Sequence, residues 1–386
     1  MLRLLHTADV HLGARHADLG TQAAAQRERQ FDAFRATVDL ALTEKVDAVL
    51  IAGDLFDSNT QPKRSVERVA AELKRLVDAR IRTFIVPGTH DVYDRASVYR
   101  AYDIAAMAGA VGTDLVTVLT PDAPRVVVKP LNAVIYGRCF ETKRAPTSPF
   151  AGFDAAADED WTWQIGLIHG ALAIPEKTDG DDVVFTRDEI RASGLDYLAL
   201  GHWHSTQQGT AGETTYAYSG APEPVAIDQD KAGSVLLVTL DERDGKKTVT
   251  IEPKTVGRTR FEHLDVDAAR AATQPALVDM INKKADKDLV LDVRLTGVRP
   301  DSLDLDVDEV VAAMSPKFLK LRLRDQSTPP LTEGPIPSAE TILGSFIRDT
   351  EAKIAELEAT DDPAAAEWRD VLRLGRLLLS GAEVTL

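Results

Sequence analysis

Histidine and aspartate residues recur at the ends of apolar segments in this chain of 386 residues. They stand in short motifs, each directly after a β-branched run of the kind that forms buried strands. The motifs are Asp9-Val-His11, Gly53-Asp54, Gly88-Thr89-His90-Asp91, His169-Gly170 and Gly201-His202-Trp203-His204. Because loops at the carboxyl ends of strands converge in α/β folds, these side chains can share one crevice.

Imidazole and carboxylate groups together bind Mn, Fe or Zn better than Ca or Mg. A central Asp carboxylate can bridge two cations, and two cations about 3.5–4 Å apart can activate a water and stabilise both the attacking and the leaving oxygen of a phosphoryl displacement. Any one of these motifs alone is typical of a solvated loop or of a histidine satisfied in the core. Together and in this order they predict a binuclear metal site.

Short apolar runs predict the strands that carry the motifs. They lie at Leu2–Leu5, Ala48–Ala52, Thr83–Val86, Ala133–Tyr136, Ile165–Ile168, Tyr197–Leu200, Ser234–Leu240 and Thr248–Ile251. Apolar residues at helical spacing predict helices over Ala23–Leu42 and Arg64–Val77, between the first three strands. This order of elements predicts an α/β domain with mixed sheets over residues 1–255.

Two further regions are expected after residue 255. Residues 256–327 read as a small α/β unit, with strands at Phe261–Val266, Leu289–Leu295 and Phe318–Leu323 and helices at Ala268–Lys283 and Val307–Met314. Residues 328–386 begin with a Pro-rich linker, because Pro disfavours both helix and central strand. Two helices follow, at Ala339–Leu357 and from Asp362-Pro363 onward, and this pair either packs on its own chain or presents an apolar face to a partner.

The composition narrows the class of protein. The chain has 45 Lys and Arg against 61 Asp and Glu, a formal net charge of −16, which argues against coating nucleic acid through overall charge. A single cysteine cannot form an internal disulfide, as expected in the reducing cytoplasm. The first ten residues lack the apolar core of a signal peptide, and no apolar stretch reaches the roughly 18–20 residues that span a bilayer. We therefore expect a cytoplasmic protein without membrane contact.

The wording of the motifs resembles a known family. His6-Thr-Ala-Asp-Val-His-Leu-Gly13, Gly53-Asp-Leu-Phe-Asp57, Leu200-Gly-His-Trp-His204 and Tyr218-Ser-Gly-Ala-Pro222 are similar to the SbcD-type DNA repair exonucleases among the calcineurin-like metallophosphoesterases. The resemblance implies a four-layer α/β/β/α sandwich with a small α/β capping domain and a C-terminal helix pair. It further implies DNA as substrate, an SbcC-type coiled-coil ATPase docked on those helices, and a homodimer.

The resemblance also assigns roles to the motif residues. Asp9, His11 and His204 would hold one metal, Asp54 would bridge, and His169 and His202 would hold the second. His90 would stand over the scissile phosphate, either as a stabiliser of the transition state or as the proton donor to the leaving oxygen, and Asp91 would orient its ring. The implied cofactors are two divalent ions, with Mn favoured over Fe or Zn.

One position departs from the family pattern. The family has Asn before the catalytic His, where its amide oxygen is a ligand of the second metal, whereas this chain has Thr89. A Thr hydroxyl is shorter and differs in geometry, so it can coordinate directly, act through a water or leave the second metal weakly held. We hypothesise a functional but altered second site.

A basic segment adjoins the catalytic motif. Between Ser58 and Arg100 nine Lys and Arg stand against five acids, a local balance of +4. Candidate DNA-binding residues are Lys63, Arg64, Arg95 and Arg100. The alternative is a solvated helix face.

Other residues have simpler interpretations. His6 is expected to order the first loop, His16 and His263 to lie on the surface, Asp57 to brace the loop after Asp54 or sit in a solvated turn, and Cys139 to be a small buried hydrophobe. Three functions remain open at this level. The first is a DNA exonuclease or endonuclease working with an ATPase, the second a phosphodiesterase or phosphatase on nucleotides or phosphoproteins, and the third a scaffold with a weakened metal site.

Overall fold

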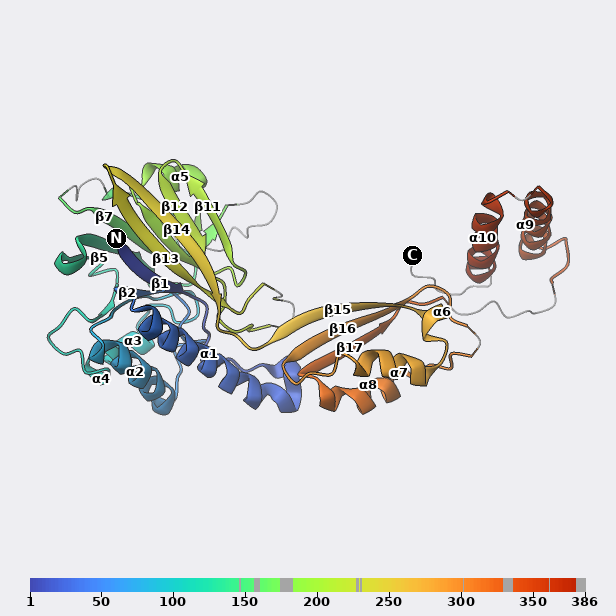
Figure 1. The fold of residues 1–386 in the computed structure, drawn as a ribbon, viewed down its shortest axis with the longest axis horizontal. Helices are drawn as coiled ribbons and strands as arrows, with labels where there is room; N and C mark the ends of the chain where they lie inside the picture. The colour runs from blue at the N-terminus through green and yellow to red at the C-terminus, as the bar shows by residue number, and fades with distance from the viewer. Residues whose placement is uncertain are drawn as a thin grey trace. The chain divides into compact units, whose positions relative to one another are not determined.

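The computed structural model describes residues 1–145, 147–155, 160–173, 183–226, 229, 231–300, 302–328, 336–360 and 362–379. It divides the chain into two compact units, Met1–Arg260 and Phe261–Leu386 (Figure 1). The first unit holds all the predicted metal ligands. The domain limits predicted at 255/256 and 327/328 remain predictions, and most of the Pro-rich linker, residues 329–335, lies outside the described residues.

The first sheet of the first unit has the strand order β14-β13-β1-β2-β3-β4. Its strands are β1 (Leu2–Thr7), β2 (Ala48–Ala52), β3 (Arg82–Val86), β4 (Val116–Val118), β13 (Ser234–Arg243) and β14 (Lys246–Thr255). The strands β1 to β4 are mutually parallel, whereas β13 is antiparallel to β1 and β14 is antiparallel to β13. The carboxyl ends of β1, β2 and β3 therefore lie side by side at one edge of the sheet.

The second sheet has the order β11-β12-β10-β7-β6-β5. Its strands are β5 (Arg125–Val128), β6 (Ala133–Arg138), β7 (Trp163–His169), β10 (Tyr197–Gly201), β11 (Gln207–Ala211) and β12 (Thr214–Tyr218). Strands β6, β7, β10 and β12 are mutually parallel, and the edge strands β5 and β11 are antiparallel. Strands β4, β5, β11 and β12 are short or polar, and they are not among the strands predicted from the apolar runs of the sequence.

Successive side chains of each strand point to opposite faces of its sheet, and both faces are buried. In β1, Leu5 packs toward α1 (Ala23–Glu44) and α2 (Lys63–Asp78), while Leu2 and Leu4 join the core between the two sheets. In β10, Tyr197 and Ala199 face that central core, and Leu198 and Leu200 face outward. The outer core includes Ile190 of the short helix α5 (Arg187–Ala192). These layers confirm the predicted four-layer α/β/β/α sandwich (Figure 1).

The connections contain several short elements that fall below the length detectable from periodicity. They are η1 (Ala17–Gln22), α3 (Val98–Ala101), α4 (Ile104–Met107), η2 (Lys129–Leu131), β8 (Ala171–Leu172) and β9 (Val184–Phe185). Helix α3 follows Ser97, whose side chain accepts a hydrogen bond from the backbone of Tyr99.

The second unit contains a three-stranded sheet of β15 (Arg260–Asp267), β16 (Leu289–Thr296) and β17 (Lys320–Asp325). Its helices are α6 (Ala268–Ala271), α7 (Gln274–Asn282) and α8 (Val307–Met314), and a 3-10 turn, η4, covers Ser315–Lys317. The prediction of one helix over residues 268–283 is wrong. Ala272 has a φ of 48°, which ends α6, and the Thr273 side chain then caps α7 by accepting from Ala276 N.

Two helices follow, α9 (Ile342–Ala359) and α10 (Ala364–Leu379). Helix α9 begins at Ile342 rather than at the predicted Ala339, because the Thr341 side chain caps it by accepting from Gly344 N. The Asp362 carboxylate accepts from Ala364 N, as expected at the start of the second helix. Among the helices in the described ranges, none combines the length and apolar character needed to cross a membrane.

Candidate metal centre

The five predicted motifs follow β1, β2, β3, β7 and β10 at their carboxyl ends. Gly201 at the end of β10 pairs with His169 at the end of β7, so these two loops start at the same level. Asp9, His11 and Asp54 have positive φ values of 53°, 49° and 50°. Non-glycine residues in this region are strained by roughly 1–3 kcal/mol each and cluster at functional sites.

The first ligand group consists of Asp9, His11 and His204, whose candidate ligand atoms all lie within 4.8 Å of one another. Nε2 of His204 lies 3.1 Å from Nε2 of His11 and 3.9 Å from Oδ1 of Asp9. Asp9 and His11 are buried. This is the set that the resemblance implies for one metal.

The second group consists of Asp9, Asp54 and His169. Oδ2 of Asp54 lies 3.1 Å from Nε2 of His169 and 3.7 Å from Nε2 of His11, so this oxygen stands between the two groups, as a bridging ligand must. The ring of His202 lies beside that of His169, with centroids 5.5 Å apart. The backbone N–H of His202 donates to Asp9.

The protonation of the imidazoles fits a metal. Nδ1 of His169 lies 3.0 Å from the carbonyl oxygen of Ala52, which can only accept, so Nδ1 carries a proton and Nε2 is the nitrogen that faces the site. That Nε2 is buried and lies 3.1 Å from Oδ2 of Asp54. Nδ1 of His11 likewise faces Oδ1 of Asp57 at 3.2 Å, which leaves Nε2 to the site. A divalent cation would take the place of any proton on these inward nitrogens and bind them together with the carboxylates.

The charges of the site favour a cation as well. Burial lowers the pKa of His169, but the charges of Asp54 and Asp9 outweigh it and raise the pKa to about 10. Burial raises the pKa of Asp54, but His169 and His11 outweigh it and hold the pKa well below its usual range. The Asp54 carboxylate is thus ionised in a buried setting, which is stable only beside positive charge.

Glycines allow this close packing. A Cβ on Gly53 would collide with the ring of His169, and one on Gly88 would collide with the carboxylate of Asp54. The φ of Gly53 is +89°, which side chains rarely adopt.

His90 lies at the exposed rim of this centre. Its side chain is 46% exposed, and its ring centroid lies 4.6 Å from that of His11. The backbone N–H of His90 donates to Oδ1 of Asp54 at 2.7 Å. Nδ1 lies 3.0 Å from the carbonyl oxygen of Asp57, which leaves Nε2 available to a substrate.

The predicted contact from Asp91 to the ring of His90 is wrong. Oδ1 of Asp91 accepts from Gly88 N at 2.7 Å, and Oδ2 accepts from Phe56 N at 3.2 Å and from the Tyr99 hydroxyl at 2.6 Å. Asp91 is fully buried, and it therefore fixes the loops that carry Asp54 and Thr89. The residue that orients His90 is Asp57, which contacts His11 as well.

Thr89 lies next to the carboxylate of Asp54, the candidate bridging ligand. Its hydroxyl is 3.5 Å from Oδ2 of Asp54, at the limit of a hydrogen bond. The side chain is therefore in the neighbourhood of the second group. Whether it ligates a metal stays a prediction.

Several other histidine predictions have clear outcomes. His6 is fully buried and joins the two sheets through the Tyr197 hydroxyl at 2.8 Å and the Leu200 carbonyl at 3.2 Å. The prediction that His16 lies on the surface is wrong, because its ring is buried between the Gln30 side chain and the Val225 carbonyl. His263 is exposed, as expected.

Cys139 is half-buried against the apolar core between the sheets. Burial raises the pKa of its thiol to about 12, so the thiolate needed for nucleophilic attack is not formed near neutral pH.

The four candidate DNA-binding residues differ in their surroundings. Arg100 lies over the Tyr93 ring at 4.0 Å and bonds to Glu141 at 3.1 Å, and Lys63 pairs with Glu67 at 3.4 Å. Arg64 is exposed at the start of α2. Arg95 is exposed and has no ion-pair partner within the described part of the chain.

Two residues that support the centre were not predicted from the sequence. Tyr99 donates to Asp91, and Gln229 contacts Nδ1 of His204 while its Oε1 accepts from the backbone of Val225. Neither stands in a recognisable motif, and only the tertiary contact identifies them.

Comparisons with known proteins agree with this geometry. The calcineurin-like phosphoesterase family model matches residues 2–206. The metallophosphoesterase YhaO of Bacillus subtilis is 25% identical over 286 residues, which cover 72% of this chain and 66% of that protein. The DNA double-strand break repair protein Mre11 of Aeropyrum pernix is 31% identical over 259 residues, covering 62% and 58%. The protein of the same name from Halobacterium salinarum is 26% identical over 300 residues, covering 77% and 71%.

The chain thus spans between 58% and 71% of the length of these relatives. All five ligand motifs lie inside the part that matches the family, which is more than half of the chain. The chain therefore belongs to the calcineurin-like phosphoesterases, a family of metal-dependent phosphoesterases.

Proposed function

We propose that the chain is a DNA nuclease, hydrolysing phosphodiester bonds as an exonuclease or endonuclease in DNA repair. The observation that carries this is the half-exposed ring of His90 beside a buried centre of carboxylates and imidazoles. DNA as the substrate is supported by the similarity to two relatives described as DNA double-strand break repair proteins.

The two ligand groups define where the metals would bind. Asp9, His11 and His204 would hold one ion, His169 and His202 the other, and Asp54 both. When bound, the ions supply an activated water and stabilise charge on the phosphoryl oxygens. Manganese is the proposed metal, because the mixed imidazole and carboxylate set suits it.

His90 supplies the proton in this proposal. The Asp57 carbonyl fixes the proton on Nδ1 of His90, so Nε2 of the imidazolium form faces the solvent side and can protonate the leaving oxygen. Because the His90 backbone bonds to Asp54, the ring and the bridging carboxylate keep a fixed separation. A phosphate bound at the metal centre is therefore within reach of the ring.

The basic segment gives a route for the DNA strand. Arg95 is exposed four residues after Asp91, and Arg100 is held by Tyr93. Lys63 and Arg64 are the further proposed contacts. These cations would contact phosphates on either side of the scissile bond, which offsets the net charge of −16 locally.

The C-terminal helices provide a surface for the proposed ATPase partner of the SbcC type. Ile342 in α9 is 79% exposed, and Leu378 in α10 is 54% exposed. Val371 and Leu379 of α10 are exposed as well, so four of the seven large apolar side chains exposed in the described residues lie on these two helices. We further propose that the protein forms a homodimer. We place it in the cytoplasm, because a chain with a single cysteine needs no internal disulfide and suits a reducing compartment.

A substrate panel tests the function. The Mn-loaded protein is offered blunt-ended duplex DNA, single-stranded DNA, a cyclic nucleotide and an aryl phosphodiester. His90→Ala serves as the blank, and His263→Ala, which removes an exposed histidine of the second unit, serves as the matched control. We expect DNA degradation that depends on His90 and not on His263.

The other outcomes identify the alternatives. Turnover of the small diesters without degradation of DNA would assign the chain to nucleotide phosphodiesterases. No turnover of any substrate, with metals bound, would indicate a scaffold.

A further inference from the structure

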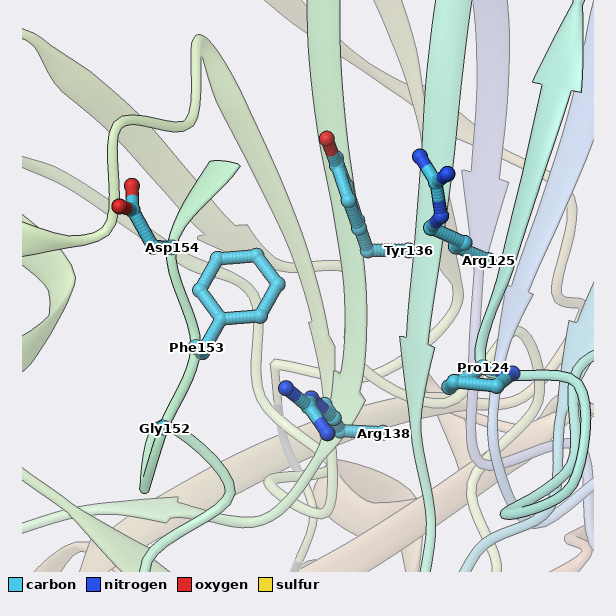
Figure 2. A pocket seen from close by; sticks show the side chains of 7 residues that line it. All are labelled: Pro124, Arg125, Tyr136, Arg138, Gly152, Phe153 and Asp154. Carbon is cyan, nitrogen blue, oxygen red and sulfur yellow. The ribbon is translucent and has the colours of Figure 1, made fainter. Parts of the chain in front are cut away.

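A pocket lies on the outer face of the second sheet, at its β5 edge. It has a volume of about 270 Å³, close to the lower end of the ~300–1,000 Å³ typical of ligand sites. Arg125 of β5 pairs with Tyr136 of β6, and Arg138 stands two residues further along β6, so these three side chains share one face of the sheet. The loop that contains Phe153 and Asp154 forms the opposite wall (Figure 2).

Arg138 lacks a counter-charge within the described residues. Its guanidinium lies 5.2 Å from the centroid of the Phe153 ring, and burial alone lowers its pKa. The carboxylate of Asp154 points away from it (Figure 2). A half-buried guanidinium that faces only an aromatic ring is suited to bind an anion, above all a phosphate, through paired N–H donors.

The pocket also has an aromatic wall. The Phe153 ring packs edge-on against Tyr136 and Phe150, with centroids 5.2 Å and 5.8 Å apart. These contacts hold the ring in place without covering it completely, since Phe153 still lines the pocket. Aromatic rings next to cations are the feature on which nucleotide bases stack.

The Arg138 end of the pocket lies at the carboxyl ends of β6 and β7, where the metal centre also lies. Arg138 pairs with Ile168, the residue before the metal ligand His169. The two side chains nevertheless face different ways, because Arg138 lies on the outer face and His169 points toward Asp54. A DNA strand bound at the metal centre can therefore continue past the ends of β6 and β7 and reach the pocket.

We propose that the pocket is an accessory nucleotide site, in which Arg138 binds a phosphate and Phe153 stacks the attached base; this rests on the proposed nuclease function. The phosphate belongs either to a DNA strand that continues from the metal centre or to a free mononucleotide. Arg125, at the exposed end of the pocket, binds the adjoining phosphate.

Binding measurements on the full-length, Mn-loaded protein test this. The probes are a short single-stranded phosphorothioate oligonucleotide, which resists hydrolysis, and dAMP. We expect Arg138→Gln to weaken oligonucleotide binding about tenfold and Phe153→Leu about fivefold. Lys143→Gln, which removes an exposed cation outside the pocket, is the matched control and should stay within about twofold. Hydrolysis of a small aryl phosphodiester should be unchanged in all three variants.

The variants also distinguish a DNA strand from a free nucleotide as the source of the phosphate. They further distinguish failure of the pocket proposal from failure of the nuclease proposal. Loss of oligonucleotide binding alone assigns the site to a DNA strand, and loss of dAMP binding too shows that free nucleotides enter. Arg138→Lys, which keeps the charge but not the fork of donors, should lie between the unaltered protein and Arg138→Gln, and it covers the case in which the Gln variant does not fold. Unchanged affinity in every pocket variant would overturn the proposal. If the unaltered protein degrades no DNA but Arg138→Gln still weakens binding, the nuclease function fails and the pocket stands.

Discussion

The two sheets contribute different chemistry to the metal centre. The loops after β1 and β2 supply both carboxylates, Asp9 and Asp54, whereas the loops after β7 and β10 supply only imidazoles, His169, His202 and His204. Neither sheet carries a complete ligand set. A metal bound at the centre therefore joins the sheets, and the sandwich must be assembled before the site exists.

Each sheet also fixes the ligands of the other. Asp9 of the first sheet accepts from the backbone of His202, and His169 of the second donates to the Ala52 carbonyl. Gly201 is required where β10 approaches β2, because a Cβ there would collide with the Ala52 carbonyl. The catalytic chemistry and the packing between sheets are thus coupled at the same few residues.

Removing the bridging carboxylate should have the largest effect. Asp54→Asn takes away the negative charge that faces both His11 and His169. Metal-assisted catalysis is worth several kcal/mol, so we expect a loss on the order of 10³-fold in hydrolysis of an aryl phosphodiester. Metal content measured on the same samples should fall as well. A variant that keeps both metals and activity within tenfold would show that Asp54 is not the bridge.

His90→Gln should have the next largest effect. The change removes a proton donor at the half-exposed rim and leaves the groups around Asp9 and Asp54 in place, although His90 also lies in a third group of possible ligands with His11 and Asp57. General acid catalysis typically contributes 10²–10⁴-fold, and we expect a loss of about 10²-fold in kcat with normal metal content. This separates the rim from the buried centre. Equal losses of metal and of activity would instead make His90 a ligand.

The buried contact between the sheets below the centre should respond to pH. The pKa of His6 is lowered to about 3 by burial, against 6.5 in the unfolded chain. Between these values the unfolded state binds a proton that the folded state does not, so stability falls as the pH falls below 6.5. From pH 6.5 to 5 this amounts to about 2 kcal/mol.

Urea unfolding at pH 7 and pH 5 measures that effect. His6→Gln cannot titrate, and the other titratable groups are common to both proteins, so the variant should lose about 2 kcal/mol less than the unaltered protein. An equal loss in both proteins would mean that His6 does not sense pH.

Local sequence patterns predict the strands of the sandwich and the candidate ligands at their ends. The strands that carry the ligands are apolar runs ending in short motifs, so Asp9, Asp54 and His169 could be placed at converging strand ends from the sequence alone. The contacts that depend on distant parts of the chain could not. His16 is buried only because Gln30 and Val225 meet its ring.

The supporting groups of the site show the same limit. Asp91 stands beside His90 in the sequence, but its buried carboxylate is taken by two backbone N–H groups and Tyr99. Asp57 reaches His90 from another loop instead. The motifs therefore predict which residues gather at the site. The packing of the loops determines which of these residues contact one another.

Thr89→Asn should have the smallest effect. It tests the comparison of the two sheets at Thr89, the position that departs from the family pattern. The Thr89 hydroxyl lies 3.5 Å from Oδ2 of Asp54, and an Asn amide oxygen extends further toward the second group, where the imidazoles of the second sheet predominate. We expect the affinity for the second Mn ion to rise about tenfold, in the range typical of ligand-supporting residues. Titration of Mn with anomalous scattering at both positions measures it, and Thr89→Ser, which keeps the hydroxyl, is the control. If the unaltered protein holds only one metal and Thr89→Asn changes neither occupancy nor activity, the second site is not limited by Thr89, and the functional but altered site inferred from this residue is excluded.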